Sequence, residues 1–222
     1  MKKNFITSLL VSILLISLVA SCSKNQNSNK MEDPNNLSED KAFIQLATET
    51  YDYLLFVSNN LKQVKLTQSE IQNNLAKIQA QTLNYEEQMK SIDLLFKNSF
   101  SIRLEKHMKT YALIWKDLNS RYSDISQEIL EKECAEVLSN KFSNGIGDVN
   151  AKKDCGWKFY LCAGAATAGA VLCHAGCETT ALATTAGLGI PACVAACGTL
   201  QAWAIVQCEE KYCTESNPLN PS

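Results

Sequence analysis

Apolar residues recur at every third or fourth position between residues 38 and 142, and no strand-like alternation of useful length occurs there. Such a period places the apolar side chains on one face of a helix. Helices of this kind bury their apolar faces against one another. We therefore predict an all-α domain over residues 38–142, a bundle of about four helices.

Polar residues predict where these helices begin, because N-cap side chains accept hydrogen bonds from the first free backbone N–H groups. The predicted starts are Ser38, with Glu39 and Asp40 in the first turn; Thr67 with Glu70; Asn84 with Glu87; and Ser123–Asp124. The stretch after Asn84 is either one long helix or two helices broken near Asn98–Ser99.

Several large or soft side chains lie on the predicted apolar stripes. We expect the aromatic residues Tyr51, Trp115 and Tyr122 in the core. Cys134 is on the stripe of its helix, so we expect a buried free thiol. A bond from Cys134 to another chain, or to the cysteine-rich segment, is the alternative.

A glycine-containing linker, residues 143–154, separates this domain from a segment rich in alanine, glycine, threonine and cysteine. Eight cysteines lie between residues 155 and 213, and the intervals between them are 6, 10, 3, 15, 3, 10 and 4 residues. This order is nearly the same when it is read backwards. Residues 214–222 are polar, and we expect a disordered tail.

The mirror symmetry predicts an antiparallel helical hairpin, because facing positions on two such helices add to a constant. When the first cysteine is paired with the last, the second with the second last, and so on inward, the two residue numbers of a pair add to 370 in three pairs and to 368 in the outermost pair. Glycines 187 and 189 supply the turn, and Pro191 suits the first turn of the second helix. We predict four nested disulfides: Cys155–Cys213, Cys162–Cys208, Cys173–Cys197 and Cys177–Cys193. Small residues on the seam, such as Ala166, Gly169 and Ala170, allow the close approach that disulfides need.

The outer faces of this hairpin are also apolar, and three interpretations follow. In the first, the hairpin docks on the helical domain, with residues such as Leu161, Val171 and Ile205 buried. In the second, it is membrane-active, because each arm carries about 19 to 27 uncharged residues, enough to cross a bilayer. In the third, Cys173, His174, Cys177, Cys193 and Cys197 hold zinc. The mirror pairing of the cysteines favours disulfides over zinc, so we expect no metal site.

The N-terminus has the anatomy of a secretory signal peptide, with Lys2 and Lys3 before an uncharged run from Phe5 to Val19. The sequence Val19-Ala20-Ser21-Cys22 resembles the lipobox of bacterial lipoproteins. The resemblance implies a signal peptide over residues 1–21 and a lipid anchor on Cys22, followed by a flexible tether over residues 22–37. By resemblance to the sorting of enterobacterial lipoproteins, Ser23 in place of aspartate implies the outer membrane more than the inner, and the periplasmic or surface side stays open.

The C-terminal segment resembles, in its paired C-x3-C motifs, the α-hairpinin peptides of plants. Leu172–Cys177, with glycine and proline before the next cysteine, is also similar to cysteine-rich bacteriocins such as halocin. Both resemblances cover only the C-terminal quarter of the chain.

Charge and candidate chemistry narrow the function. A net charge of −2 gives no basic surface for nucleic acid. The only histidines, His107 and His174, lie in different segments, and we expect His107 on a solvated helix face and His174 at a surface or an interface. No catalytic motif occurs, so we expect neither an enzyme nor a cofactor. The predicted function is a non-catalytic envelope lipoprotein that presents a stapled helical module to a protein partner or to the envelope. The alternative is a bacteriocin-like or pore-forming effector.

Overall fold

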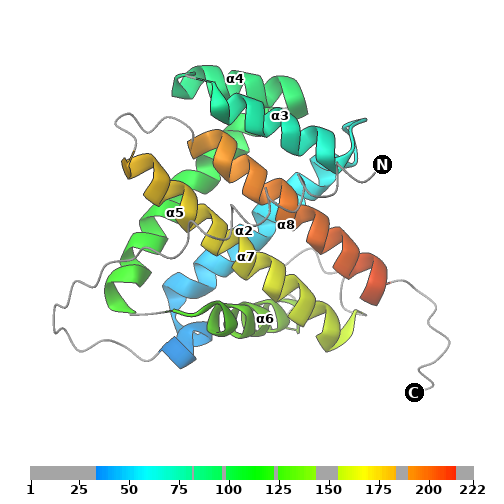
Figure 1. Cartoon of the computed structure of the whole chain (residues 1–222). Coiled ribbons are helices and arrows are strands. Elements are labelled where there is room, and N and C mark those ends of the chain that lie inside the picture. Colours follow the sequence, from blue (N-terminus) through cyan, green and yellow to red (C-terminus); the bar gives the residue numbers. More distant parts are fainter. Residues whose placement is uncertain are drawn as a thin grey trace, which may run out of the picture. The chain divides into compact units, whose positions relative to one another are not determined.

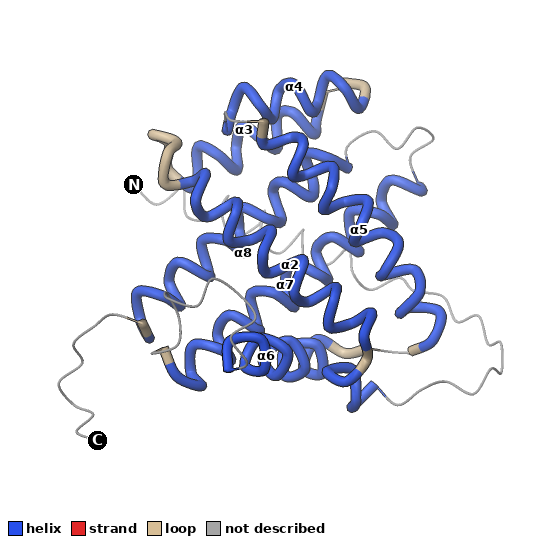
Figure 2. The backbone as a smooth tube through the Cα atoms, turned by 180° about the vertical axis from the view of Figure 1, so that it is seen from behind, coloured by secondary structure: helices blue, strands red, loops and turns tan. Residues whose placement is uncertain are grey.

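The computed structural model describes residues 34–81, 83–96, 99–122, 125–143, 155–183 and 190–213. All regular structure in these ranges is helical, which confirms the predicted all-α class (Figure 2). The described residues belong to one compact unit, which begins at Glu32. The predicted signal peptide, Cys22, most of the tether and linker, the hairpin turn and the C-terminal tail lie outside the described residues.

Five α-helices precede the hairpin. They follow a short 3-10 helix, η2 (Pro34–Glu39), and are α2 (Lys41–Leu61), α3 (Gln68–Ala80), α4 (Tyr85–Phe96), α5 (Phe100–Arg121) and α6 (Gln127–Ser143). The stretch after Asn84 therefore forms two helices. The break lies where it was expected, because Ser99 has a left-handed backbone with φ of 57°, which does not continue a right-handed helix.

Two of the predicted helix starts are confirmed, and one is wrong. Thr67 and Glu70 form a capping box, and Asn84 and Glu87 bond each other's backbone in the same reciprocal way. The first long helix is capped by Asp40 instead of Ser38, because the Asp40 carboxylate accepts from the Ala42 and Phe43 N–H groups. The described part of the last helix of the bundle begins at Gln127, and the start predicted near residues 123–124 lies outside the described residues.

The predicted tether is too long at its C-terminal end. Pro34–Leu37 belong to η2, and the Leu37 side chain is fully buried among α2, α5 and α6 residues. The buried Leu37 side chain and the hydrogen bond that the Ser38 N–H donates to the buried Glu133 carboxylate hold this segment on the bundle.

The hairpin consists of α7 (Gly156–Ala183) and α8 (Ile190–Tyr212), which lie side by side in Figure 1. Four disulfides join them: Cys155–Cys213, Cys162–Cys208, Cys173–Cys197 and Cys177–Cys193. These are the four pairs that the constant totals predict, and the Cα atoms are 4.3 to 5.8 Å apart. Cys213 follows the last residue of α8, as expected.

The other five helices pack against the hairpin. α6 packs on α7 and α3 runs beside α8, whereas α2 crosses α8 (Figure 1). A Cβ atom on Gly164 of α7 would lie 2.6 Å from the backbone nitrogen of Ala135 in α6, so only glycine allows that approach. Val171 and Ile205 are fully buried, in agreement with a docked hairpin, whereas Leu161 is 45% exposed, against expectation.

The arms of the hairpin still have the composition of membrane helices. Gly156–Cys177 and Ile190–Tyr212 are long and apolar enough to cross a bilayer, with mean hydropathies of 1.3 and 1.4 in their most apolar stretches. Of these two stretches, 56% and 50% are buried inside the protein. Core helices of soluble proteins have the same length and composition.

Candidate functional site

The two histidines of the chain meet in the interior of the protein. His107 comes from α5 and His174 from α7, and His107 Nε2 lies 3.2 Å from His174 Nδ1. Their side chains are 0% and 1% exposed. The expectation of a solvated His107 is therefore wrong, and we refer to the two residues as the histidine pair.

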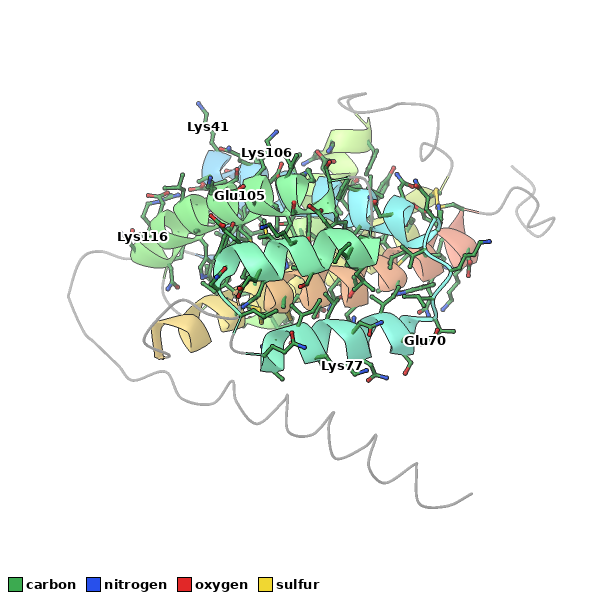
Figure 3. The ribbon with its side chains drawn as sticks, turned by 90° about the horizontal axis from the view of Figure 1, so that it is seen from above. Lys41, Glu70, Lys77, Glu105, Lys106 and Lys116 are labelled. Carbon is green, nitrogen blue, oxygen red and sulfur yellow. A yellow bond between two sulfur atoms is a disulfide. The ribbon has the colours of Figure 1, made fainter. Side chains whose placement is uncertain are left out.

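The helical period explains the position of each ring. His107 comes three residues after Leu104 and four before Tyr111, and both of these are buried, so it shares their face of α5. Its neighbour Lys106 points away from the protein instead (Figure 3). His174 follows the buried Val171 by one turn. The spacing from Leu104 to Tyr111 was the sequence signal for His107, and the charged residues beside it concealed that signal.

Aromatic side chains hold the histidine pair in place. Tyr53 of α2 stacks on the His107 ring with centroids 4.1 Å apart and planes 3° apart. Tyr111 meets His174 edge to face, with centroids 5.3 Å apart. The Tyr111 hydroxyl also donates to the Val171 carbonyl at 2.7 Å, which ties α5 to α7 at this point. The rings therefore have little freedom to turn.

A carboxylate lies behind the histidine pair. Glu49 Oε1 is 3.5 Å from His107 Nδ1, and Arg103 Nη1 is 2.5 Å from the same oxygen. Burial raises the pKa of Glu49, but the contacts with His107 and Arg103 outweigh burial and lower it overall. Glu49 is therefore an anion at neutral pH, and it favours a proton on the facing His107 nitrogen.

Burial lowers the pKa of both histidines, because a charged imidazole loses its hydration in the interior. For His107, Glu49 opposes this effect. For His174, the neighbouring His107 lowers the pKa further, while the backbone of Val194 favours the protonated form. His174 Nε2 and His107 Nδ1 have no hydrogen-bond partner of ordinary geometry.

A cavity of about 370 Å³ opens beside the histidine pair. Its walls come from α4, α5, α7 and α8 and are mainly apolar, with Glu105 and Lys109 as the charged residues on them. The lining residues are Tyr85, Glu105, His107, Met108, Lys109, Tyr111, Ala112, His174, Ile190 and Val194. A ligand in this space meets both imidazoles and otherwise mostly carbon atoms.

Three of the described cysteines lie close enough together to be considered as metal ligands. Cys177, Cys193 and Cys197 bring their sulfur atoms within 4.8 Å of one another. All three belong to disulfides, however, and only a free thiolate binds a metal ion. Cys134 is buried and unpaired, as expected, and its pKa is raised by burial. Cys22 lies outside the described residues.

The chain matches no model of a known protein family, no curated protein and no solved structure. The histidine pair and its cavity are therefore the features from which a function is argued.

Proposed function

We propose that this protein is a lipid-anchored, non-catalytic binding protein of the bacterial cell envelope, whose binding site is the cavity beside the histidine pair. The single observation that carries this proposal is the cavity itself, about 370 Å³ of mainly apolar space with two buried imidazoles on its wall. Small-molecule sites have this character: a few hundred Å³, apolar walls and a few convergent polar groups.

The walls define the class of ligand. Met108, Tyr111, Ile190 and Val194 suit a small apolar or aromatic body, and the imidazoles suit one polar group on it. Disulfides form and persist outside the cytoplasm, and the four in the hairpin stabilise the helices around the cavity there. The lipid on Cys22 keeps this module at the membrane.

A neutral fluorescent probe, N-phenyl-1-naphthylamine, tests the cavity. Its emission should rise saturably with the oxidised full-length chain. Ala112→Trp places an indole in the cavity and should weaken the probe affinity at least tenfold. Lys116→Trp, one turn further along the exposed side of α5, adds the same side chain outside the cavity and should leave the affinity within twofold. Equal affinities for the two variants, or no saturable binding, would contradict the proposal.

A second candidate rests on the two apolar arms of the hairpin, which have the length and composition of membrane spans. On this view α7 and α8 leave their covering helices and enter a bilayer with their disulfides closed. Dye-filled vesicles of phosphatidylethanolamine and phosphatidylglycerol separate the two functions. A binding protein leaves the dye inside, and rapid release by the oxidised chain would favour the membrane-active effector.

A further inference from the structure

The inner nitrogens of the histidine pair are His107 Nε2 and His174 Nδ1. Two neutral imidazoles carry two protons for four ring nitrogens. The Glu49 carboxylate favours one of them on His107 Nδ1, at 3.5 Å. His174 Nε2, the outer nitrogen of the other ring, has no hydrogen-bond partner of ordinary geometry. The two inner nitrogens face each other across 3.2 Å, so that one can donate a hydrogen bond to the other, or both can direct lone pairs at a cation between them.

The distance between the two inner nitrogens fits a metal ion that is bound by both of them. Zinc–imidazole bonds are about 2.0–2.1 Å, so two nitrogens on one tetrahedral ion lie about 3.3 Å apart. The ring centroids are only 5.0 Å apart and the planes are 68° apart, so the rings are not aligned in a straight head-to-head contact. Two imidazoles that converge on one ion have this bent arrangement.

We propose that His107 Nε2 and His174 Nδ1 bind a divalent transition-metal ion of the zinc type, with Glu49 as the residue that positions His107. A carboxylate behind a metal-bound histidine is the common way in which proteins fix the ring and its proton. The remaining positions of the ion open into the cavity, where water or a donor atom of the ligand fills them. This inference rests on the proposed function in one respect. It assumes that the cavity binds a ligand, and it identifies the polar group of that ligand as one that binds a metal ion.

The metal alone is the probe for the experiment. Tag-free full-length chain carrying Cys22→Ser, so that the Cys22 thiol does not compete for the metal, is titrated with Co²⁺ in its oxidised form. We expect one equivalent to give a visible absorption band that Zn²⁺ displaces. His107→Gln and His174→Gln should each weaken binding at least tenfold. No band at millimolar Co²⁺, or a band that survives both substitutions, would overturn the inference.

Wild-type spectra keep the test decisive even where a glutamine variant fails to fold. The chain has two histidines, so its imidazole NMR signals are two sets. Zn²⁺ should shift both sets, and Co²⁺ should broaden both. Signals that stay unchanged at saturating metal would exclude the site without any substitution.

Glu49→Gln tests the positioning role, because it keeps the size of the side chain and removes its charge. Binding should weaken about 10- to 100-fold with one ion still bound, and the His107 nitrogen shifts should change. Glu136→Gln, an exposed glutamate on α6, is the matched control and should leave the affinity within twofold. Unchanged affinity in Glu49→Gln would remove Glu49 from the proposal.

The metal and the cavity proposals fail separately. Cobalt binding without binding of the fluorescent probe would leave the metal site standing and refute the apolar binding site. If the fluorescent probe binds and Ala112→Trp weakens its binding, but cobalt does not bind, the apolar binding site would stand and the metal site would be refuted.

Discussion

Tyr53 of α2 occupies the space that a side chain at position 198 of α8 would need. A Cβ atom on Gly198 would lie 2.7 Å from Tyr53 Cε1, closer than real Cβ contacts come. The same tyrosine ring stacks on His107. One aromatic side chain therefore connects the stapled hairpin with the histidine pair.

Gly198→Ala should lower the free energy of unfolding by about 1–3 kcal/mol, because the added methyl group overpacks the contact with a buried ring. Urea unfolding of the oxidised protein, followed by circular dichroism, measures this change. Gly176→Ala is the matched control on the exposed side of α7, where a Cβ meets nothing within 4 Å. It should be neutral or stabilise by about 0.5–1 kcal/mol, since alanine is the better helix former. Equal losses at both positions would contradict the proposed contact.

Asp40 should make stability depend on acid pH. The Arg121 guanidinium lowers the pKa of this carboxyl strongly, with help from the Phe43 and Ala42 N–H groups and the Tyr122 hydroxyl. In the unfolded chain an aspartate has a pKa of about 3.9. The folded value is the lower one, so the stabilisation is complete above about pH 4 and is lost as the pH falls further.

Asp40→Asn tests this dependence because it keeps an N-cap acceptor and removes the charge. Its stability deficit against wild type should be constant from pH 7 to pH 5 and should shrink from pH 4 downward. Asp40→Ala also loses the cap and should cost about 1 kcal/mol more. A deficit in Asp40→Asn that does not change with pH would show that the ion pair with Arg121 is not the cause.

The nested disulfides should be found chemically and should stabilise the fold. Peptide mapping without reduction should recover Cys162 linked to Cys208 and Cys173 linked to Cys197, whereas a link within one arm would refute the antiparallel hairpin. Replacing Cys162 and Cys208 together by alanine should lower the free energy of unfolding by about 2–4 kcal/mol. The effects of several removals should not add, because nested bridges restrict the same loop of the unfolded chain.

Cys134 should be unreactive until the protein unfolds. Burial raises the pKa of its thiol, so little reactive thiolate forms, and the side chain is fully buried. In the oxidised Cys22→Ser chain, a thiol reagent should label no cysteine in buffer and one in guanidinium chloride. Rapid labelling in buffer would place Cys134 in a segment that opens locally.

Acylation of Cys22 is the prediction on which the location depends. Radiolabelled palmitate should enter the protein, because the residues before Cys22 resemble a lipobox. Cys22→Ala should abolish the label and leave the precursor uncut. Continued labelling of that variant would refute the anchor.

The sequence by itself determined the all-α class and the partners of the eight cysteines in the hairpin. Both depend on periodicity within one helix or within a symmetric pair of helices. Cys162 and Cys208, for example, face each other because two antiparallel helices rise equally per residue, so the residue numbers of facing positions have a constant sum. The capping box of Thr67 and Glu70 was equally readable, since its two residues bond across a single turn.

Only the tertiary structure decided which helices cover the hairpin, and with them the candidate site. His107 and His174 are 67 residues apart, and no local rule relates their helices. Their contact depends on how α5 packs on α2 and on the hairpin, through contacts such as Tyr53 stacked on His107 and the hydrogen bond from Tyr111 to the Val171 carbonyl. Helix packing is a sum of many weak contacts between distant residues, so a periodic pattern identifies the faces that are buried but not the face that each of them meets.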